Sequence, residues 1–224
     1  DLSAFESTPK ESIKAKQTKE NFAQAVGTAF VLKSIIDLNL AIPKALLTAA
    51  DNAEPEFNED GQWVWSYSKQ TGGDTYEVQL VATREGENEN TWELFVTNST
   101  LGIEDRLFFT GVSNNDGTEG TWTYNQLLGE AEGPVSSIQW TVASETDISL
   151  RLDVTSDRFG NEGDYIEYSF QDDIKNVVYY NADVDQTTEL QLNVETNEGF
   201  IIAPDYNNGE KGCWDENFDD GACS

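Results

Sequence analysis

The chain has 224 residues, 38% of them hydrophobic and 11% aromatic, which is enough to fill a sizeable core and argues against a disordered chain. Its formal net charge of -29 is uneven: residues 1–50 carry six Lys against five acids, whereas residues 51–224 carry seven basic residues against 37 of the 42 acids. Such a surface repels phosphates and anionic lipid headgroups, so we expect no nucleic-acid partner and no charge-driven membrane binding. Cations, basic proteins and neutral sugars stay open as partners.

The sequence contains no His and no Met. Without His, the chain lacks the commonest general base, the Ser-His and Cys-His nucleophile pairs, and nearly every His-ligated metal site. Its first ten residues are polar and do not begin with Met. We therefore expect that any targeting peptide is removed before Asp1.

A helical segment is predicted over residues 1–50. Thr8 is placed as an N-cap, Pro9 as the first helical residue and Glu11 as the residue that returns to the cap. A second, shorter helix is predicted from Pro43 to about Ala50. Apolar residues recur at helical spacing through the first helix, at Ile13, Phe22, Ala25, Val26, Ala29, Phe30, Leu32, Ile36 and Leu40.

This apolar stretch is too short for a membrane span. Lys33, Asp37, Pro43 and Lys44 interrupt it, and a transmembrane helix needs about 20 uninterrupted apolar residues. The pattern instead predicts a helix pair buried against an apolar surface of the same chain. We expect no transmembrane segment.

After a polar linker, the hydrophobic period changes from helical to two, which is typical of strands. Eleven short strands are predicted between residues 51 and 204. Their inward-facing residues are Trp63, Trp65 and Tyr67; Tyr76, Val78, Leu80 and Ala82; Trp92, Leu94 and Val96; Leu107 and Phe109; Trp122 and Tyr124; Ile138, Trp140 and Val142; Ile148, Leu150, Leu152 and Val154; Ile166, Tyr168 and Phe170; Val178 and Tyr180; Leu190, Leu192 and Val194; and Phe200 to Ile202.

Turn-forming residues separate nearly every pair of strands, as in Thr71 to Asp74 and Asp183 to Gln186. Short connections require antiparallel neighbours, so the sequence predicts a mainly β fold in which about eleven strands form an antiparallel meander. Each strand has one apolar face to bury. We therefore expect an open or closed barrel with the N-terminal helices packed on its apolar concavity.

Two segments place an acid and a glycine before an aromatic alternation. They are Asp60 to Tyr67 and Glu119 to Tyr124, and they suggest a duplicated four-stranded unit, although the chemistry of two similar hairpins explains them almost as well. The pattern at Asn115 to Tyr124 resembles secreted or outer-membrane lipoproteins of Bacteroidota-type bacteria. That resemblance implies a β-rich lipoprotein with a lipidated Cys before Asp1, and it transfers no catalytic residues.

Residues 205–224 form an acidic tail that contains both cysteines, Cys213 and Cys223. Two cysteines without His make a poor metal site, whereas nine intervening residues allow a local disulfide. A disulfide indicates an oxidising compartment. We therefore predict an exported protein of the periplasm, the outer-membrane surface or the extracellular space.

Calcium is the one cofactor that the sequence suggests, since carboxylates and amides cluster in three loops. The candidate ligands are Asp116, Glu119, Asp157 and Asp164. An EF-hand in the tail is excluded because Asp220 occupies the position of the required glycine. The same Asn, Asp and Gly residues are also typical of tight turns.

A two-carboxylate glycosidase needs an inward-pointing acid among aromatics. The strand acids Glu77, Glu93, Glu167 and Glu189 all fall in the outward phase of their strands, where a general acid would lack the burial it needs. We therefore do not expect an enzyme, and a carbohydrate-active enzyme is kept only as an alternative.

A partner surface is suggested by apolar residues outside the predicted core. Val64, Val81, Phe95 and Phe108 lie in the outward phase, and Trp214 lies in the tail. The sequence thus favours a non-catalytic binding or accessory module of the bacterial envelope that engages a protein, a glycan or an apolar ligand. The second alternative is a structural subunit of an outer-membrane complex.

Overall fold

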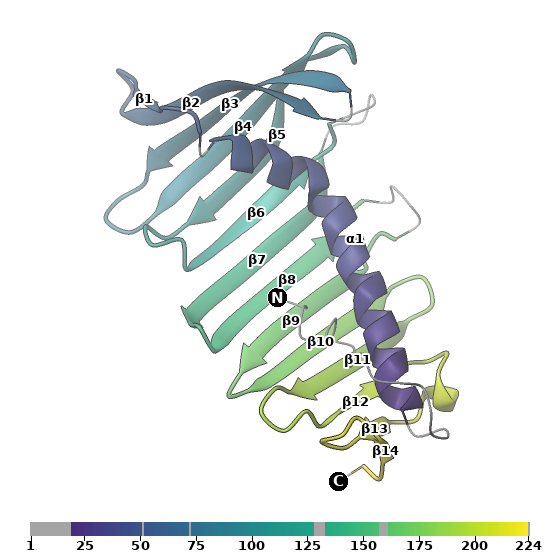
Figure 1. Cartoon of the computed structure of the whole chain (residues 1–224). Coiled ribbons are helices and arrows are strands. Elements are labelled where there is room, and N and C mark those ends of the chain that lie inside the picture. The colour runs from purple at the N-terminus through teal and green to yellow at the C-terminus, as the bar shows by residue number, and fades with distance from the viewer. Residues whose placement is uncertain (1–18, 51, 72, 128–132, 157–160, 224) are drawn as a thin grey trace. The chain divides into compact units, whose positions relative to one another are not determined.

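The computed structural model describes residues 19–50, 52–71, 73–127, 133–156 and 161–223, with only the backbone at 35–49 and 71. Within these residues there is one α-helix, one short 3-10 helix (Asn207–Gly209) and one antiparallel sheet whose 14 strands are hydrogen-bonded in sequence order (Figure 1). The α-helix is α1 (Glu20–Ala50). The strands are β1 (Glu56–Phe57), β2 (Gln62–Thr71), β3 (Asp74–Arg84), β4 (Asn90–Asn98), β5 (Ile103–Ser113), β6 (Glu119–Asn125), β7 (Pro134–Ser144), β8 (Asp147–Val154), β9 (Tyr165–Gln171), β10 (Ile174–Asn181), β11 (Gln186–Asn193), β12 (Gly199–Ile202), β13 (Gly212–Trp214) and β14 (Asp220–Gly221).

The mainly β class and the antiparallel meander are confirmed, but the barrel is not. The predicted strands correspond to β2 through β12, and the three additional strands, β1, β13 and β14, have only two or three residues each. β1 pairs only with β2, and β14 only with β13, so the sheet is not closed. An alternating pattern predicts which residues form strands, but it does not determine whether the first strand meets the last.

The chain divides into two compact units. Unit 1 comprises Asp1–Asp37, Val142–Leu152 and Gly160–Ser224, and unit 2 comprises Leu38–Thr141 and Asp153–Phe159. Both units contain part of the helix and part of the sheet. The boundaries predicted after residues 50 and 204 therefore do not coincide with the division into compact units.

A single helix of 31 residues replaces the predicted pair, because α1 continues through Pro43. A proline removes one backbone donor, but the remaining hydrogen bonds of a long helix can continue on either side of it. The predicted cap at Thr8 and Glu11 lies outside the described residues. No helix in the described part of the chain has the length and apolar character needed to cross a membrane.

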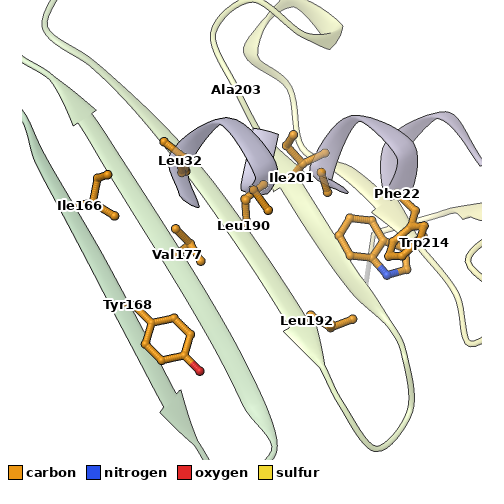
Figure 2. Packing of buried hydrophobic residues seen from close by; sticks show 12 residues of the cluster. Phe22, Leu32, Ile166, Tyr168, Val177, Leu190, Leu192, Ile201, Ala203 and Trp214 are labelled. Atoms are coloured by element: carbon orange, nitrogen blue, oxygen red, sulfur yellow. The ribbon is translucent and has the colours of Figure 1, made fainter. Parts of the chain in front are cut away.

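The core of unit 1 lies between α1 and one face of strands β9 to β13 (Figure 2). Phe22, Ala25, Ala29 and Leu32 recur at helical spacing and supply the helix side. The sheet side consists of Ile166, Tyr168, Val177, Leu190, Leu192, Ile201, Ala203 and Trp214. Burial of apolar side chains contributes about 25 cal/mol for each Å² removed from water, so this contact stabilises the packing of the first half of α1 on the sheet.

Two predicted strand phases are wrong. In β10 the inward residue is Val177, which is fully buried, because Val177 pairs with Tyr168 and Leu190 of the neighbouring strands. The run Val177 to Tyr180 is apolar in both phases, so alternation could not decide between them. In β5 a β-bulge at Phe108 places Leu107 beside Phe95, on the face opposite Phe109.

In unit 2 the aromatic residues of the apolar face lie across glycines on neighbouring strands. Gly111 pairs with Trp122, and Gly120 pairs with Trp140. A Cβ at Gly120 would stand 2.5 Å from Cζ2 of Trp140 and 2.5 Å from the carbonyl oxygen of Val112. Gly120 is therefore required by close packing, not by the turn that precedes it.

Candidate functional site

A hollow of about 410 Å³ opens on the sheet of unit 2. Most of its lining residues alternate with the buried Val78 and Leu80 of β3 and so lie on the opposite face, which we call the polar face. Two cross-strand rows form its floor: Ser66 pairs with Gln79, which pairs with Phe95, and Ser68 pairs with Glu77, which pairs with Thr97. The lining residues are Ser66, Tyr67, Ser68, Glu77, Val78, Gln79, Phe95, Thr97 and Asp105.

Asp105 reaches the hollow because β5 is irregular. Between the pairs Val96–Arg106 and Asn98–Ile103 the register shifts, so β5 has two residues opposite Thr97. Asp105 adopts a φ of 43°, and its backbone N–H donates to Oγ1 of Thr97 at 2.9 Å. A non-glycine residue in this region is uncommon, so this conformation depends on the bulge and on the Thr97 hydroxyl.

Two carboxylates therefore line the same hollow, Glu77 from β3 and Asp105 from β5. Both residues are exposed, and no Lys or Arg of the described residues forms an ion pair with either. The hydroxyl and amide groups beside them add hydrogen-bond acceptors, and the half-buried Phe95 adds an aromatic surface. Carboxylates beside an aromatic ring suit a cation that carries N–H donors on an apolar stem.

The same geometry is unfavourable for acid catalysis. A carboxylic general acid needs apolar, water-excluding surroundings that keep it protonated near neutral pH. Glu77 and Asp105 are open to solvent instead, and the chain has no His to serve as the base. The arrangement can bind a charged group but lacks the features of a proton-transfer site.

The predicted partner residues do not form one exposed patch. Val64 and Val81 pair across β2 and β3, and Phe95 lies in the hollow. Val81 is 8% exposed, Phe108 is 5% exposed beside Tyr124, and Trp214 is 3% exposed. Of the five residues, only the half-buried Phe95 lines the hollow.

The predicted calcium ligands are placed separately by the structure. Asp116 is exposed in the turn between β5 and β6, and Glu119 is exposed at the start of β6. Asn114 organises that turn, because its side-chain oxygen accepts the backbone N–H of Thr118 at 2.9 Å. Asp157 lies outside the described residues. In the described part of the chain, no three Cys, Asp or Glu side chains gather as a metal site would require.

Asp164 is 7% exposed and is satisfied by protein groups. One of its carboxylate oxygens accepts the Tyr179 hydroxyl at 2.7 Å, and the other accepts the backbone N–H of Ala182 at 2.8 Å. Burial and, to a smaller extent, the hydrogen bond to Asp164 together raise the pKa of Tyr179 to about 12. Asp164 therefore has a structural role in fixing the end of β10.

The other strand acids lie on the outward face, as their phase indicates. Glu167 forms an ion pair with Arg151, whose guanidinium lies 3.9 Å from the ring centre of Tyr165. Glu189 pairs with Val178 across β10 and β11, and Glu93 is exposed on β4. None of the three lines the hollow.

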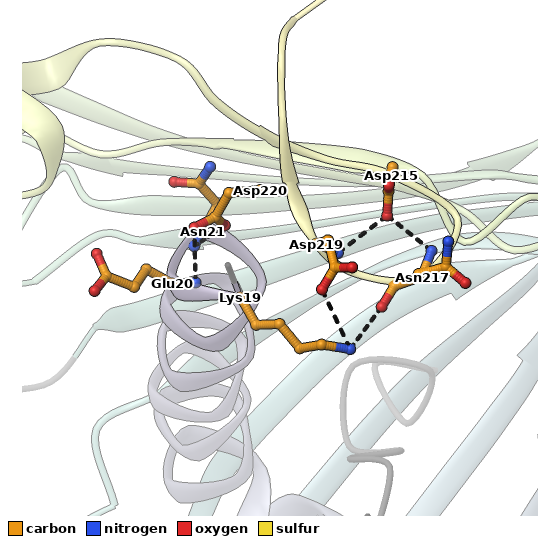
Figure 3. Close-up of polar contacts among 7 residues, drawn as sticks. All are labelled: Lys19, Glu20, Asn21, Asp215, Asn217, Asp219 and Asp220. Carbon is orange, nitrogen blue, oxygen red and sulfur yellow. Dashed lines mark hydrogen bonds and ion pairs between the residues drawn. The ribbon is translucent and has the colours of Figure 1, made fainter. Parts of the chain in front are cut away.

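The tail is tied to the start of α1 (Figure 3). The carboxylate oxygens of Asp220 accept the backbone N–H groups of Glu20 at 3.1 Å and Asn21 at 2.9 Å. These N–H groups have no partner inside the helix, so Asp220 caps α1. The predicted disulfide between Cys213 and Cys223 is confirmed, with a Cα–Cα distance of 5.2 Å.

The sequence alone did not single out the hollow as a site. The alternation predicts only that Glu77 and Phe95 face outward, and their proximity depends on the register of β3 and β4. The polar alternation of β2 and β3 was the available signal. Asp105 gives no such signal in the sequence, because its position depends on a bulge.

No protein-family model, curated protein or solved structure matches this chain.

Proposed function

We propose that this protein is a non-catalytic binding module that holds a cationic group of a protein partner in the hollow of unit 2. The observation that carries the proposal is the pair of carboxylates, Glu77 and Asp105, without a basic partner among the described residues, in a hollow that also contains Phe95. A Lys or Arg side chain can place its apolar stem against the ring and its charge between the carboxylates.

The overall charge supports the same class of partner. With a formal net charge of -29, the protein attracts basic surfaces over a distance of about 8 Å at physiological salt. We further propose that the module is exported to the bacterial envelope and is lipid-anchored ahead of Asp1. The disulfide between Cys213 and Cys223 agrees with an oxidising compartment.

Binding at this site can be measured with a small cation of the right shape. We would titrate Nα-acetyl-lysine N-methylamide, which keeps its charged ε-ammonium group, into ¹⁵N-labelled protein and follow the amide resonances by NMR. The proposal predicts shifts concentrated at Ser66, Ser68, Phe95 and Thr97, and their loss in the Glu77→Gln, Asp105→Asn double variant. The control is Glu93→Gln, which removes an exposed acid of β4 outside the hollow.

Three results would contradict the proposal. Shifts scattered over the acidic surface would show unspecific attraction by net charge. Shifts at the hollow that survive in the double variant would show that the carboxylates do not bind the cation. A neutral sugar that shifts the same resonances more strongly than the lysine derivative would reassign the site to a glycan.

A further inference from the structure

Strand β2 has an edge that β1 covers only in part. β1 pairs with β2 at two positions, Glu56 with Val64 and Phe57 with Trp63, whereas β2 continues to Thr71. Beyond Val64, none of the described strands lies on the outer side of β2. Unpaired strand edges present backbone donors and acceptors to any extended chain that approaches.

The turn between β1 and β2 shows which residues of β2 direct their backbone groups away from β3. The carbonyl of Gln62 accepts the backbone N–H of Asn58 at 2.9 Å, so the backbone of Gln62 points away from β3. In an antiparallel strand this direction alternates with every residue. Ser66, Ser68 and Gln70 therefore direct their N–H and C=O groups to the open side.

We propose that this edge binds an extended, basic segment of a partner protein, which adds to the sheet as a further strand beside β2. The inference rests on the proposed function in one respect: a basic side chain of the added strand occupies the hollow. The main-chain hydrogen bonds to Ser66, Ser68 and Gln70 are new and independent of the hollow. Strand addition of this kind takes affinity from the backbone and specificity from alternate side chains.

The polar face of the sheet determines which side chains fit at every second residue of the added strand. A residue opposite Ser68 lies on the same face as Ser68 and Glu77, which pair across β2 and β3. Neighbouring strands are about 4.8 Å apart, so the added strand lies about 9.6 Å from β3. A Lys or Arg side chain of the added strand can extend over the small Ser68, so that its charged end reaches the carboxylate of Glu77.

The opposite face determines the alternate set. On this face the added strand lies beside the half-buried Trp65 and Tyr67. It begins where β1 ends, next to the contact between Phe57 and Trp63, whose ring centres are 5.0 Å apart. Trp63 is 48% exposed and Phe57 is 61% exposed. Apolar side chains fit this surface. The partner segment therefore alternates basic and apolar residues.

Charge decides between the possible occupants of the edge. A second copy of this chain would bring another net charge of -29 and another acidic β1–β2 turn, with Glu56, Glu59 and Asp60. Like charges at short distance oppose such pairing. Natural edges are often protected by proline, bulges or several lysines, whereas β2 contains no proline and a single lysine, Lys69.

The test uses the unaltered protein and a nine-residue peptide of alternating lysine and valine. The lysine side chains lie on the polar face whichever way the peptide runs. If the peptide pairs antiparallel to β2, the backbone amides of its lysines face β2 and those of its valines face away. If it pairs parallel, the valine amides face β2 and the lysine amides face away. One peptide is N-methylated at two lysine amides and a second at two valine amides. Because methylation of an amide that faces β2 removes a main-chain hydrogen bond, one of the two peptides binds about tenfold or more weakly, while the affinity of the other changes by less than about threefold. NMR shifts on binding concentrate at Ser66, Ser68 and Gln70.

Equal weakening by the two methylated peptides, or none, would overturn strand addition. A dimer by sedimentation in which the amides of Ser66, Ser68 and Gln70 are already protected would also overturn it, because a second copy would then occupy the edge. Glu77→Gln is expected to weaken the lysine-valine peptide about threefold or more, and Glu93→Gln less than twofold. Equal effects of these two substitutions would overturn the assigned basic side chain.

The failures of the two proposals can be distinguished. If Nα-acetyl-lysine N-methylamide binds at the hollow but no peptide binds the edge of β2, strand addition is wrong and the cation site is supported. If the peptides show the selective methylation effect but the lysine derivative does not bind, the edge stands and the cation site is wrong. If neither ligand binds, both proposals are wrong.

Discussion

The first and last strands of the sheet end it in different ways. At the last strands, a disulfide joins Cys213 of β13 to Cys223, which follows β14, and Trp214 is 3% exposed against the helix. At the first strands, β1 covers two residues of β2, and Trp63 is 48% exposed. Both regions combine acids, glycines and a tryptophan, yet the tryptophan is buried at one end and half exposed at the other.

The difference lies in what each tryptophan contacts. Trp214 lies across Gly199, donates its indole N–H to the carbonyl of Asn197 at 2.8 Å and meets Phe22 with ring centres 5.4 Å apart. Trp63 contacts only Phe57 among the described rings. The buried Trp214 stabilises the fold, whereas the short β1 leaves backbone groups of β2 available for a partner.

The largest effect should separate these two tryptophans. We expect Trp214→Ala to lower the free energy of unfolding by about 3 to 5 kcal/mol, because it leaves a cavity between α1 and the sheet. Trp63→Ala should cost about 1 kcal/mol, since this side chain is half exposed. Urea denaturation of both variants measures the difference. Similar costs would show that the two ends are packed alike.

Removal of the disulfide should have the next largest effect. Replacing Cys213 and Cys223 by serine opens a loop of about ten residues, which should cost about 3 kcal/mol through the entropy of the unfolded chain. Thermal unfolding with and without a reductant checks this value, and the reductant should leave the serine variant unchanged. A wild-type melting temperature that is insensitive to reduction would contradict a structural role for the bond.

Loss of the cap on α1 should be smaller. Asp220→Ala should cost about 1 to 2 kcal/mol, because two backbone N–H groups at the start of the helix lose their acceptors. The neighbouring Asp219 contacts the exposed Lys19 at 3.7 Å, so Asp219→Asn should cost less than about 1 kcal/mol. Circular dichroism during urea denaturation gives both values. The account fails here if the two substitutions are equally costly.

The smallest effect should be an alkaline loss of stability. Burial raises the pKa of Tyr67 and of Tyr179 to about 12, from an ordinary value of 10. A raised pKa means that these phenols stabilise the fold fully below pH 10, and that this contribution disappears as the pH rises from 10 to about 12. Melting temperatures from pH 8 to 12 should fall over this range. Tyr179→Phe should make the fall shallower, and an unchanged slope would contradict the assignment.

The sequence predicted the parts of the fold that depend on local pattern. All eleven alternating segments form strands, and the disulfide forms between cysteines close in sequence. β1, β13 and β14 are too short to show alternation. The cap on α1 comes from Asp220, about 200 residues along the chain from the helix start, so no local signal could indicate it.

The hollow was less predictable for the same reason. Its position depends on the pairing of Ser68, Glu77 and Thr97 across three strands, which alternation suggests but does not fix. Asp105 enters it through a bulge that shifts the register of β5. Features that depend on register and irregular pairing require the three-dimensional structure.

Amide hydrogen exchange tests the open edge of β2 most directly. In the unliganded monomer we expect the amides of Ser66, Ser68 and Gln70 to exchange rapidly, because they point away from β3. The alternate amides of Trp65 and Lys69 should be protected by their hydrogen bonds to β3. Equal and strong protection along Trp65 to Gln70 would contradict the account, because it would show that this edge is already covered.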